Sequence, residues 1–221
     1  MKSQFFLFLL FQFSLYSCTS KAPTQRQHQQ PNIIFILADD MGYADAGCYG
    51  QKIIKTPNID RLAKEGMRFT QCYAGAAVCA PSRSVLMTGL HAGHTRVRGN
   101  FGIGGVKGLA GIEGRVPIKA EDYTIAEMLK EGNYTTGMIG KWGLGEPNTT
   151  GEPNAQGFDE FYGFLNQRRA HSYYPDYLWE NKEKVMLTGN EEGKGTDYTH
   201  DLFAQKAINF IKKNRQVYRQ S

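Results

Sequence analysis

Apolar and polar positions alternate in blocks after a polar segment that ends near residue 31. Residues 33–37 form a continuous apolar run, which predicts a strand covered on both faces. Residues 67–73 and 135–139 give two further predicted strands. Strands that alternate with helical stretches are typical of an α/β fold with a largely parallel sheet. The pattern therefore predicts the α/β class.

Four helices are predicted from their capping residues and from the spacing of their apolar positions. They are residues 59–65 between Thr56-Pro57 and Gly66, residues 81–88 with Cys79 at the N-terminal end, residues 124–130 between the cap Thr124 and Gly132, and residues 201–212. The sequence shows no internal repeat and no interdomain linker after the polar segment, so one α/β domain or part of one is expected.

The first 18 residues have the pattern of a targeting segment rather than of a folded element. Their apolar run is too short to span a bilayer as a mature helix. The run ends in Leu15-Tyr16-Ser17-Cys18, which resembles a bacterial lipobox, in which cleavage leaves a lipidated cysteine. Residues 19–31 are polar and rich in glutamine, which predicts a flexible tether. We expect an exported periplasmic or outer-membrane lipoprotein with a lipid on Cys18; plain secretion is the alternative.

The composition indicates a soluble globular domain and says little more about function. The chain has 221 residues, of which 41% are hydrophobic and 21% charged, as in a soluble globular domain. Its formal net charge of +5 mildly suits a polyanionic substrate. The charge is too small and too scattered to indicate a nucleic-acid partner.

Two adjacent carboxylates, Asp39 and Asp40, follow the first predicted strand. Neighbouring carboxylates repel each other unless a cation lies between them, and hard oxygen ligands suit Ca²⁺ or Mg²⁺. A pair that merely caps a turn is the alternative. Lys141 follows the predicted strand 135–139, and the carboxyl ends of parallel strands meet at one sheet edge. We therefore expect these three side chains to converge.

Cys79 lies at the start of a predicted helix, where the helix dipole and free amides favour a reactive thiol. The residues alone thus indicate a thiol enzyme or a redox switch. However, the run from Cys79 to Gly89, CAPSRSVLMTG, resembles the signature of the sulfatase family. Residues 33–42 resemble the opening strand and metal loop of that family, and residues 140–145, GKWGLG, resemble its second signature.

The resemblance begins near Asn32 and implies a specific fold and chemistry. The fold is an alkaline phosphatase-like, mostly parallel sheet flanked by helices, with residues 32–221 as the N-terminal part of a catalytic domain. In this family the cysteine is oxidised to formylglycine, whose hydrated aldehyde attacks sulfur as the nucleophile. Formylglycine-generating or anaerobic sulfatase-maturating enzymes make this change, and Pro81 and Arg83 belong to the segment that they recognise.

The resemblance also assigns roles to individual residues. Asp39, Asp40 and the product of Cys79 are implied ligands of Ca²⁺, with Mg²⁺ as the alternative ion. Arg83 is implied to anchor the hydrated aldehyde and the metal carboxylates. Lys141 is implied to neutralise sulfate oxygens as a compact positive charge. Cys79, Arg83 and Lys141 are therefore the predicted catalytic residues.

The resemblance bears on the other cysteines as well. If Cys18 carries a lipid, three of the four cysteines remain, and three thiols cannot all pair. Conversion of Cys79 would leave Cys48 and Cys72 as a pair. A disulfide between Cys72 and Cys79, with Cys48 buried, is the alternative.

One position departs from the commonest family pattern, and a second candidate residue lies outside the family motifs. Gly143 stands where that pattern places a histidine that contacts the hydrated nucleophile, which we interpret as a subfamily difference. His171 lies in an aromatic loop with Tyr173 and Tyr174. There it is predicted to bind a sugar hydroxyl while a tyrosine stacks on the ring; a purely structural loop histidine is the alternative.

We therefore expect a sulfuric ester hydrolase acting on sulfated glycans or aryl sulfates. One alternative is a phosphate or phosphonate ester hydrolase of the same superfamily, and another is a non-catalytic surface lipoprotein or glycan-binding remnant. Full family members carry further metal and catalytic residues that nothing after Asp201 matches. We expect the chain to be an N-terminal fragment with little or no activity by itself.

Overall fold

The structure is a computed structural model that describes residues 30–100 and 116–217. The predicted signal segment and most of the predicted tether lie outside the described residues. The chain divides into two units, one ending at Met41 and the other beginning at Gly42. No helix in the described ranges is long and apolar enough to cross a membrane.

The described part of the first unit, residues 30–41, contains no regular secondary structure. The strand predicted over residues 33–37 is therefore wrong for this structure, and its side chains are exposed, Ile36 by 81%. The strand predicted over residues 67–73, in the second unit, is also absent. A strand is stable only when a neighbour takes up its backbone hydrogen bonds, and neither segment pairs with another described strand.

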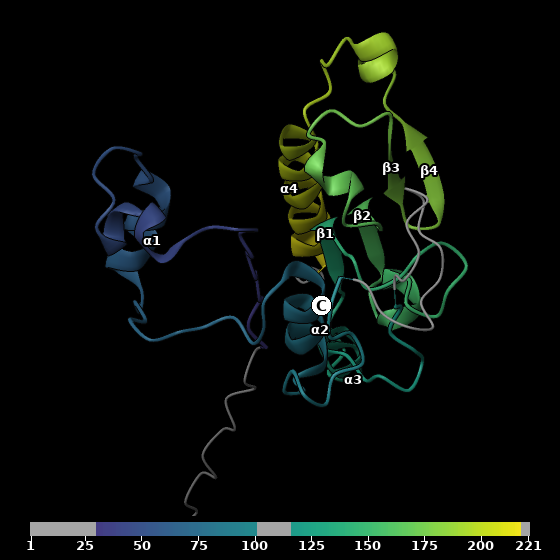
Figure 1. Cartoon of the computed structure of the whole chain (residues 1–221), viewed down its shortest axis with the longest axis horizontal. Helices are drawn as coiled ribbons and strands as arrows, with labels where there is room; N and C mark the ends of the chain where they lie inside the picture. Colours follow the sequence, from purple (N-terminus) through teal and green to yellow (C-terminus); the bar gives the residue numbers. More distant parts are fainter. Residues whose placement is uncertain (1–29, 101–115, 218–221) are drawn as a thin grey trace, which may run out of the picture. The chain divides into compact units, whose positions relative to one another are not determined.

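A four-stranded sheet forms the centre of the second unit, in the order β1-β2-β3-β4 (Figure 1). The strands are β1 (Gly137–Lys141), β2 (Glu160–Phe164), β3 (Tyr177–Glu180) and β4 (Glu183–Met186). β1 and β2 are parallel, with Met138 opposite Phe161, whereas the other two pairings are antiparallel. The α/β class is confirmed, but the described sheet is mixed rather than mostly parallel. Its first strand corresponds to the one predicted over residues 135–139.

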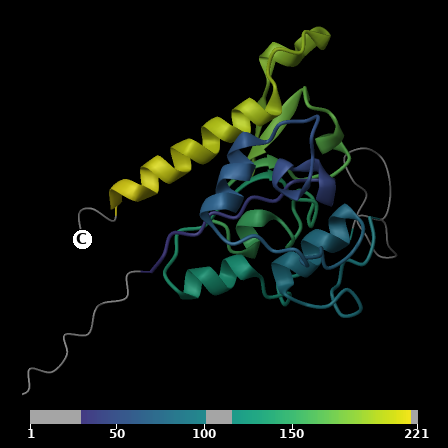
Figure 2. The ribbon, with the colours of Figure 1, turned by 90° about the vertical axis from the view of Figure 1, so that its left-hand side faces the viewer.

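The four predicted helices are all present. They are α1 (Pro57–Glu65), α2 (Cys79–Thr88), α3 (Ile125–Glu131) and α4 (Thr199–Val217), the last shown along its length in Figure 2. Thr124 caps α3, since its hydroxyl accepts from the Glu127 N–H while the Glu127 carboxylate accepts from the Thr124 N–H. Short 3-10 helices that the sequence did not predict are Tyr43–Asp45, Gly47–Tyr49, Pro153–Gln156, Arg169–His171 and Thr188–Gly193.

Both faces of the sheet carry buried side chains, as the two-residue period of a strand requires. On one face, Phe203 of α4 meets the rings of Tyr162 and Phe164 edge-on, with centroids 6.1 and 5.9 Å apart. On the other face, Phe161 packs with Trp142 and with Ala80 of α2. Burial of each large apolar side chain contributes about 1.5–3 kcal/mol. The sheet therefore fixes the start of α2 against the loop that follows β1.

Candidate active site

Cys79 is the first residue of α2 and is half-buried. Its Sγ donates to Oδ1 of Asn100 over 3.5 Å, and the backbone N–H of Ala80 donates to the same oxygen over 3.2 Å. Asn100 thus satisfies one of the free amides at the helix start. The sequence prediction that Cys79 opens a helix is confirmed, whereas Asn100 was not predicted from the sequence.

Arg83 connects α2 to the sheet. Its side chain is buried, and its Nη1 donates a hydrogen bond to the backbone carbonyl of Lys141. A buried guanidinium has to donate to acceptors inside the protein, because desolvation of an unpaired charge is costly. The contact brings the CAPSR segment and the GKWGLG segment together across 58 residues of sequence.

Lys141 is the last residue of β1, so the strand runs two residues further than predicted. Its side chain is half-buried. The structure therefore places Cys79, Arg83 and Lys141 on two elements that Arg83 joins. The functional roles predicted for the three residues remain predictions.

The loop after β1 is held closely by backbone and side-chain contacts. Trp142 is 1% exposed, and its Nε1 donates to the carbonyl of Gly151 over 2.6 Å. A Cβ at Gly145 would lie 2.1 Å from the same Gly151 oxygen, so no larger residue fits. Gly143 has φ +80°, and a Cβ there would lie 2.3 Å from Cγ of Gln167. A side chain at position 143 therefore does not fit beside Gln167 in its observed position.

A pocket opens next to the start of α2. Its lining includes Ala80, Asn100, Gly143, Glu146 and Gln167. The pocket therefore lies between the segment that carries Cys79 and the loop that follows Lys141. Its volume is about 10 Å³, which is room for roughly one water molecule.

Asp39 and Asp40 belong to the first unit, and Cys79 belongs to the second. Both are exposed, and Asp40 has a left-handed backbone with φ +57°. The prediction that these carboxylates lie close to Lys141 remains a prediction, because Lys141 belongs to the second unit. Within residues 30–100 and 116–217, no group of three or more His, Cys, Asp or Glu side chains could hold a metal ion. Two carboxylates have the right chemistry for Ca²⁺ but fall short of the six to eight ligands that this ion takes.

His171 ends a short 3-10 helix, Arg169–His171, and is exposed. Beside it in sequence, Tyr173 and Tyr174 belong to a cluster of rings that also contains Tyr198 and His200. Tyr198 stacks on His200 with centroids 5.3 Å apart, and Tyr173 lies 5.4 Å from His200. Tyr173 and Tyr174 remain 52% and 48% exposed. The sequence did not indicate that residues 198 and 200 would join this aromatic loop.

The cysteine pairings considered from the sequence are both absent. Cys48, Cys72 and Cys79 are free thiols. The backbone N–H of Cys48 donates to the Asp60 carboxylate, which ties this residue to α1, while Cys72 is exposed. The predicted Cys48–Cys72 pair is therefore wrong for this structure, and Cys18 lies outside the described residues.

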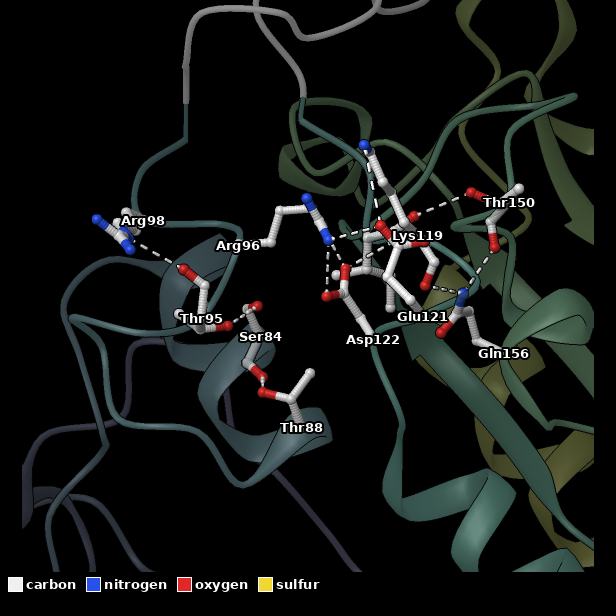
Figure 3. A network of polar contacts seen from close by, with 11 residues as sticks. Ser84, Thr88, Thr95, Arg96, Arg98, Lys119, Glu121, Asp122, Thr150 and Gln156 are labelled. Atoms are coloured by element: carbon white, nitrogen blue, oxygen red, sulfur yellow. Dashed lines mark hydrogen bonds and ion pairs between the residues drawn. The ribbon is translucent and has the colours of Figure 1, made fainter.

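A polar network fixes the segment that leads toward Asn100 (Figure 3). The hydroxyls of Ser84 and Thr95 hydrogen-bond to each other, and both residues are fully buried. The guanidinium of Arg96 binds both oxygens of the Asp122 carboxylate. Bidentate pairs of this kind fix orientation as well as distance. The network therefore sets the path of residues 95–98 between α2 and the segment before α3.

We expect this network to make the protein sensitive to acid. Burial raises the pKa of Asp122, but the hydrogen bonds from Arg96 and from the Lys119 N–H outweigh it, so the pKa lies below its ordinary value. A carboxylate with a lowered pKa stabilises the fold above its unfolded pKa of about 3.9, and this stabilisation is lost as the pH falls through the folded pKa. Asp122→Asn should lower stability at neutral pH and flatten the acid slope in urea titrations. Glu65→Gln, at an exposed position of α1, is the control; equal slopes in wild type and Asp122→Asn would contradict the expectation.

Comparison with known proteins identifies the class to which this fold and site belong. A model of the sulfatase family matches residues 31–218. The chain therefore belongs to the sulfatase family. Among its relatives, N-acetylglucosamine-6-O-sulfatase of Bacteroides thetaiotaomicron is 33% identical over 198 residues, which are 90% of this chain and 30% of that protein. Arylsulfatase G of Mus musculus is 40% identical over 197 residues, which are 83% of this chain and 34% of that protein.

Solved structures give the same result. The crystal structure of Ps i-CgsB matches with a TM-score of 0.67 and 35% identity, over 84% of this chain and 42% of that one. The structure of BT4656 in complex with D-glucosamine-2-N,6-O-disulfate matches with a TM-score of 0.64 and 32% identity, over 83% of this chain and 31% of that one. The sulfatase fold expected from the resemblance is thus confirmed. The chain spans about a third of the length of the curated relatives it matches.

Proposed function

We propose that this chain contributes the nucleophile-bearing part of an enzyme that hydrolyses sulfuric esters. The observation that carries the proposal is the Arg83 contact. It joins the helix that begins at Cys79 to the strand that ends at Lys141, so both sulfatase signatures meet in one place. A reactive residue at a helix start, a buried guanidinium and a nearby lysine form a positively charged setting that suits a sulfate group.

Formylglycine made from Cys79 would be the nucleophile in this proposal. Ca²⁺, or alternatively Mg²⁺, would supply positive charge to the sulfate oxygens when bound. Asp39, Asp40 and the formylglycine made from Cys79 would be ligands of this ion. Arg83 would orient the hydrated aldehyde, and Lys141 would neutralise charge on the sulfate. The maturation partner would be a formylglycine-generating or an anaerobic sulfatase-maturating enzyme.

We infer that the substrate is a sulfated glycan; an aryl sulfate is the alternative, because other relatives are arylsulfatases. Two relatives carry sulfated sugars in their names or complexes: the N-acetylglucosamine-6-O-sulfatase, and BT4656 with its glucosamine disulfate. The exposed rings of Tyr173 and Tyr174 support the same class, since flat aromatic faces suit the apolar faces of sugar rings. His171, exposed in the preceding 3-10 helix, would donate to or accept from a sugar hydroxyl.

Tyr173→Ala should weaken binding of a sulfated oligosaccharide by about tenfold, the effect of losing one aromatic contact of roughly 1–1.5 kcal/mol. Isothermal titration with a sulfated hexasaccharide would measure the change. Tyr134→Ala is the control, because this half-buried tyrosine lies outside the ring cluster. Equal dissociation constants for wild type and Tyr173→Ala would argue against a glycan surface at this cluster.

The reaction class is tested by a side-by-side assay of sulfate and phosphate esters. The protein should be the product of its complete gene, co-expressed with a maturation enzyme and supplied with Ca²⁺. Hydrolysis of the sulfate ester alone supports the proposal. A preference for phosphate or phosphonate esters would support the superfamily alternative, and turnover of neither would support a non-catalytic surface protein.

We also propose export with a lipid on Cys18, which would anchor the protein to a bacterial membrane. The support is the lipobox-like end of the N-terminal segment. Incorporation of labelled palmitate that disappears in Cys18→Ala would support the anchor. A protein that is secreted without label would contradict it.

A further inference from the structure

The side chain of Gln167 lies in the space that Gly143 leaves open. Gln167 is 3% exposed, so it is part of the interior of the second unit. A Cβ at Gly143 would lie 2.3 Å from Cγ, 2.6 Å from Cδ and 3.0 Å from Oε1 of Gln167. Approaches under 3 Å are not tolerated between carbon atoms in a packed interior. A side chain at position 143 and the observed position of Gln167 therefore exclude each other.

The hydrogen bonds around Gln167 fix the orientation of its amide. The Ala80 N–H can only donate, so the Asn100 atom that it meets has to be the acceptor oxygen Oδ1. Gln167 meets the same oxygen over 3.3 Å, which requires its NH₂ group on that side. A backbone amide of α2 thus sets the orientation of both side-chain amides. The Cys79 thiol donates to the same Asn100 oxygen.

The carbonyl oxygen of the Gln167 amide lowers the stability of the fold. Its Oε1 is buried and has no hydrogen-bond partner among the described residues. A buried carbonyl without a partner lowers stability, and an apolar side chain of the same shape avoids that cost. Packing alone would thus favour methionine or leucine at this position. Gln167 lines the small pocket at the start of α2 together with Ala80 and Asn100, which places its polar group at the helix that begins with Cys79.

We propose that Gln167 is a positioning residue for Cys79. Through the space that Gly143 leaves, its Nε2 holds Asn100, and Asn100 holds the Cys79 side chain at the first turn of α2. The catalytic meaning of this role rests on the proposed function. The positioning itself rests on the contacts alone.

The test is the reactivity of Cys79 in the chain that still carries the thiol. Iodoacetamide labelling, followed by chymotryptic cleavage after Tyr73, separates Cys79 from Cys72 and gives a rate for each by mass spectrometry. Gln167→Met keeps the size of the side chain and removes its hydrogen bond. We expect the Cys79 rate to rise by about threefold or more, the effect of one lost hydrogen bond. The Cys72 rate and the melting temperature should not fall, since Cys72 is exposed and methionine avoids the unpaired carbonyl.

Two further variants separate positioning from packing. Asn100→Ala should raise the Cys79 rate as Gln167→Met does, and the double variant should be no faster than the faster single one, because both act through one contact. Gly143→Ala should also raise the rate by displacing Gln167. An unchanged Cys79 rate in Gln167→Met would overturn the proposal, as would additive effects in the double variant. These results do not depend on sulfatase activity, so the proposal and the proposed function can fail separately.

Discussion

Replacing Cys79 with alanine is expected to reduce sulfate-ester hydrolysis by the mature, full-length protein to background, a loss of about 10³-fold or more. Cys79 is the source of the nucleophile in the proposed reaction, and alanine has no group that can be converted to an aldehyde. Its half-buried position at the first residue of α2 means that the substitution removes few packing contacts. The melting temperature should therefore stay close to that of the wild type while activity disappears.

Cys72→Ala is the matched control for this variant. Cys72 lies seven residues earlier, is exposed and is a free thiol in the structure. The Cys72→Ala variant should retain full activity. Activity retained by Cys79→Ala would exclude the formylglycine mechanism, and loss of activity in both variants would instead indicate a general requirement for thiols.

Arg83→Ala is expected to lower the free energy of unfolding by about 2–4 kcal/mol. The substitution leaves the carbonyl of Lys141 without the buried donor that it has in the structure, and it opens a cavity where an 8% exposed side chain was packed. Because Arg83 joins α2 to β1, activity should be lost as well. Urea denaturation followed by circular dichroism gives the change in stability.

Arg61→Ala provides the comparison, since Arg61 is an exposed arginine on α1. Its effect should stay within about 0.5 kcal/mol. If Arg83→Ala unfolds at the same urea concentration as Arg61→Ala, the Arg83 contact is not important for the fold. The link between the two signatures would then lose its support.

The sequence was most informative where local chemistry determines the element. Capping residues located the four helices, since a side chain such as Thr124 satisfies free amides within its own helix. The hairpin from β3 to β4 was missed, although its two-residue turn begins with Asn181, whose φ of +53° is typical of such turns. The segment of residues 33–37 was predicted as a buried strand, but burial depends on a partner that local sequence does not specify.

In the candidate site, too, local motifs reveal some residues, whereas others depend on contacts between distant parts of the sequence. Cys79, Arg83 and Lys141 were found from their motifs; the structure places the first two on the expected helix and Lys141 at the end of β1 instead of beyond it. Asn100 and Gln167 were not found, because Asn100 contacts α2 across 20 positions of sequence and Gln167 contacts Asn100 across 67. The glycine at position 143 was recognised as a departure from the family pattern, and in the structure the side chain of Gln167 occupies the space beside it.

The most direct test of the account is the mass of the peptide of residues 69–83 after co-expression with a formylglycine-generating enzyme. This tryptic peptide contains Cys79 and, as an unconverted reference, Cys72. Conversion of a cysteine to formylglycine replaces the thiol by an aldehyde and lowers the mass by about 18 Da. We expect this loss of mass, with fragment ions that place it at Cys79 and leave Cys72 unchanged. A peptide with two intact cysteines, in cells that convert a known sulfatase, would contradict it.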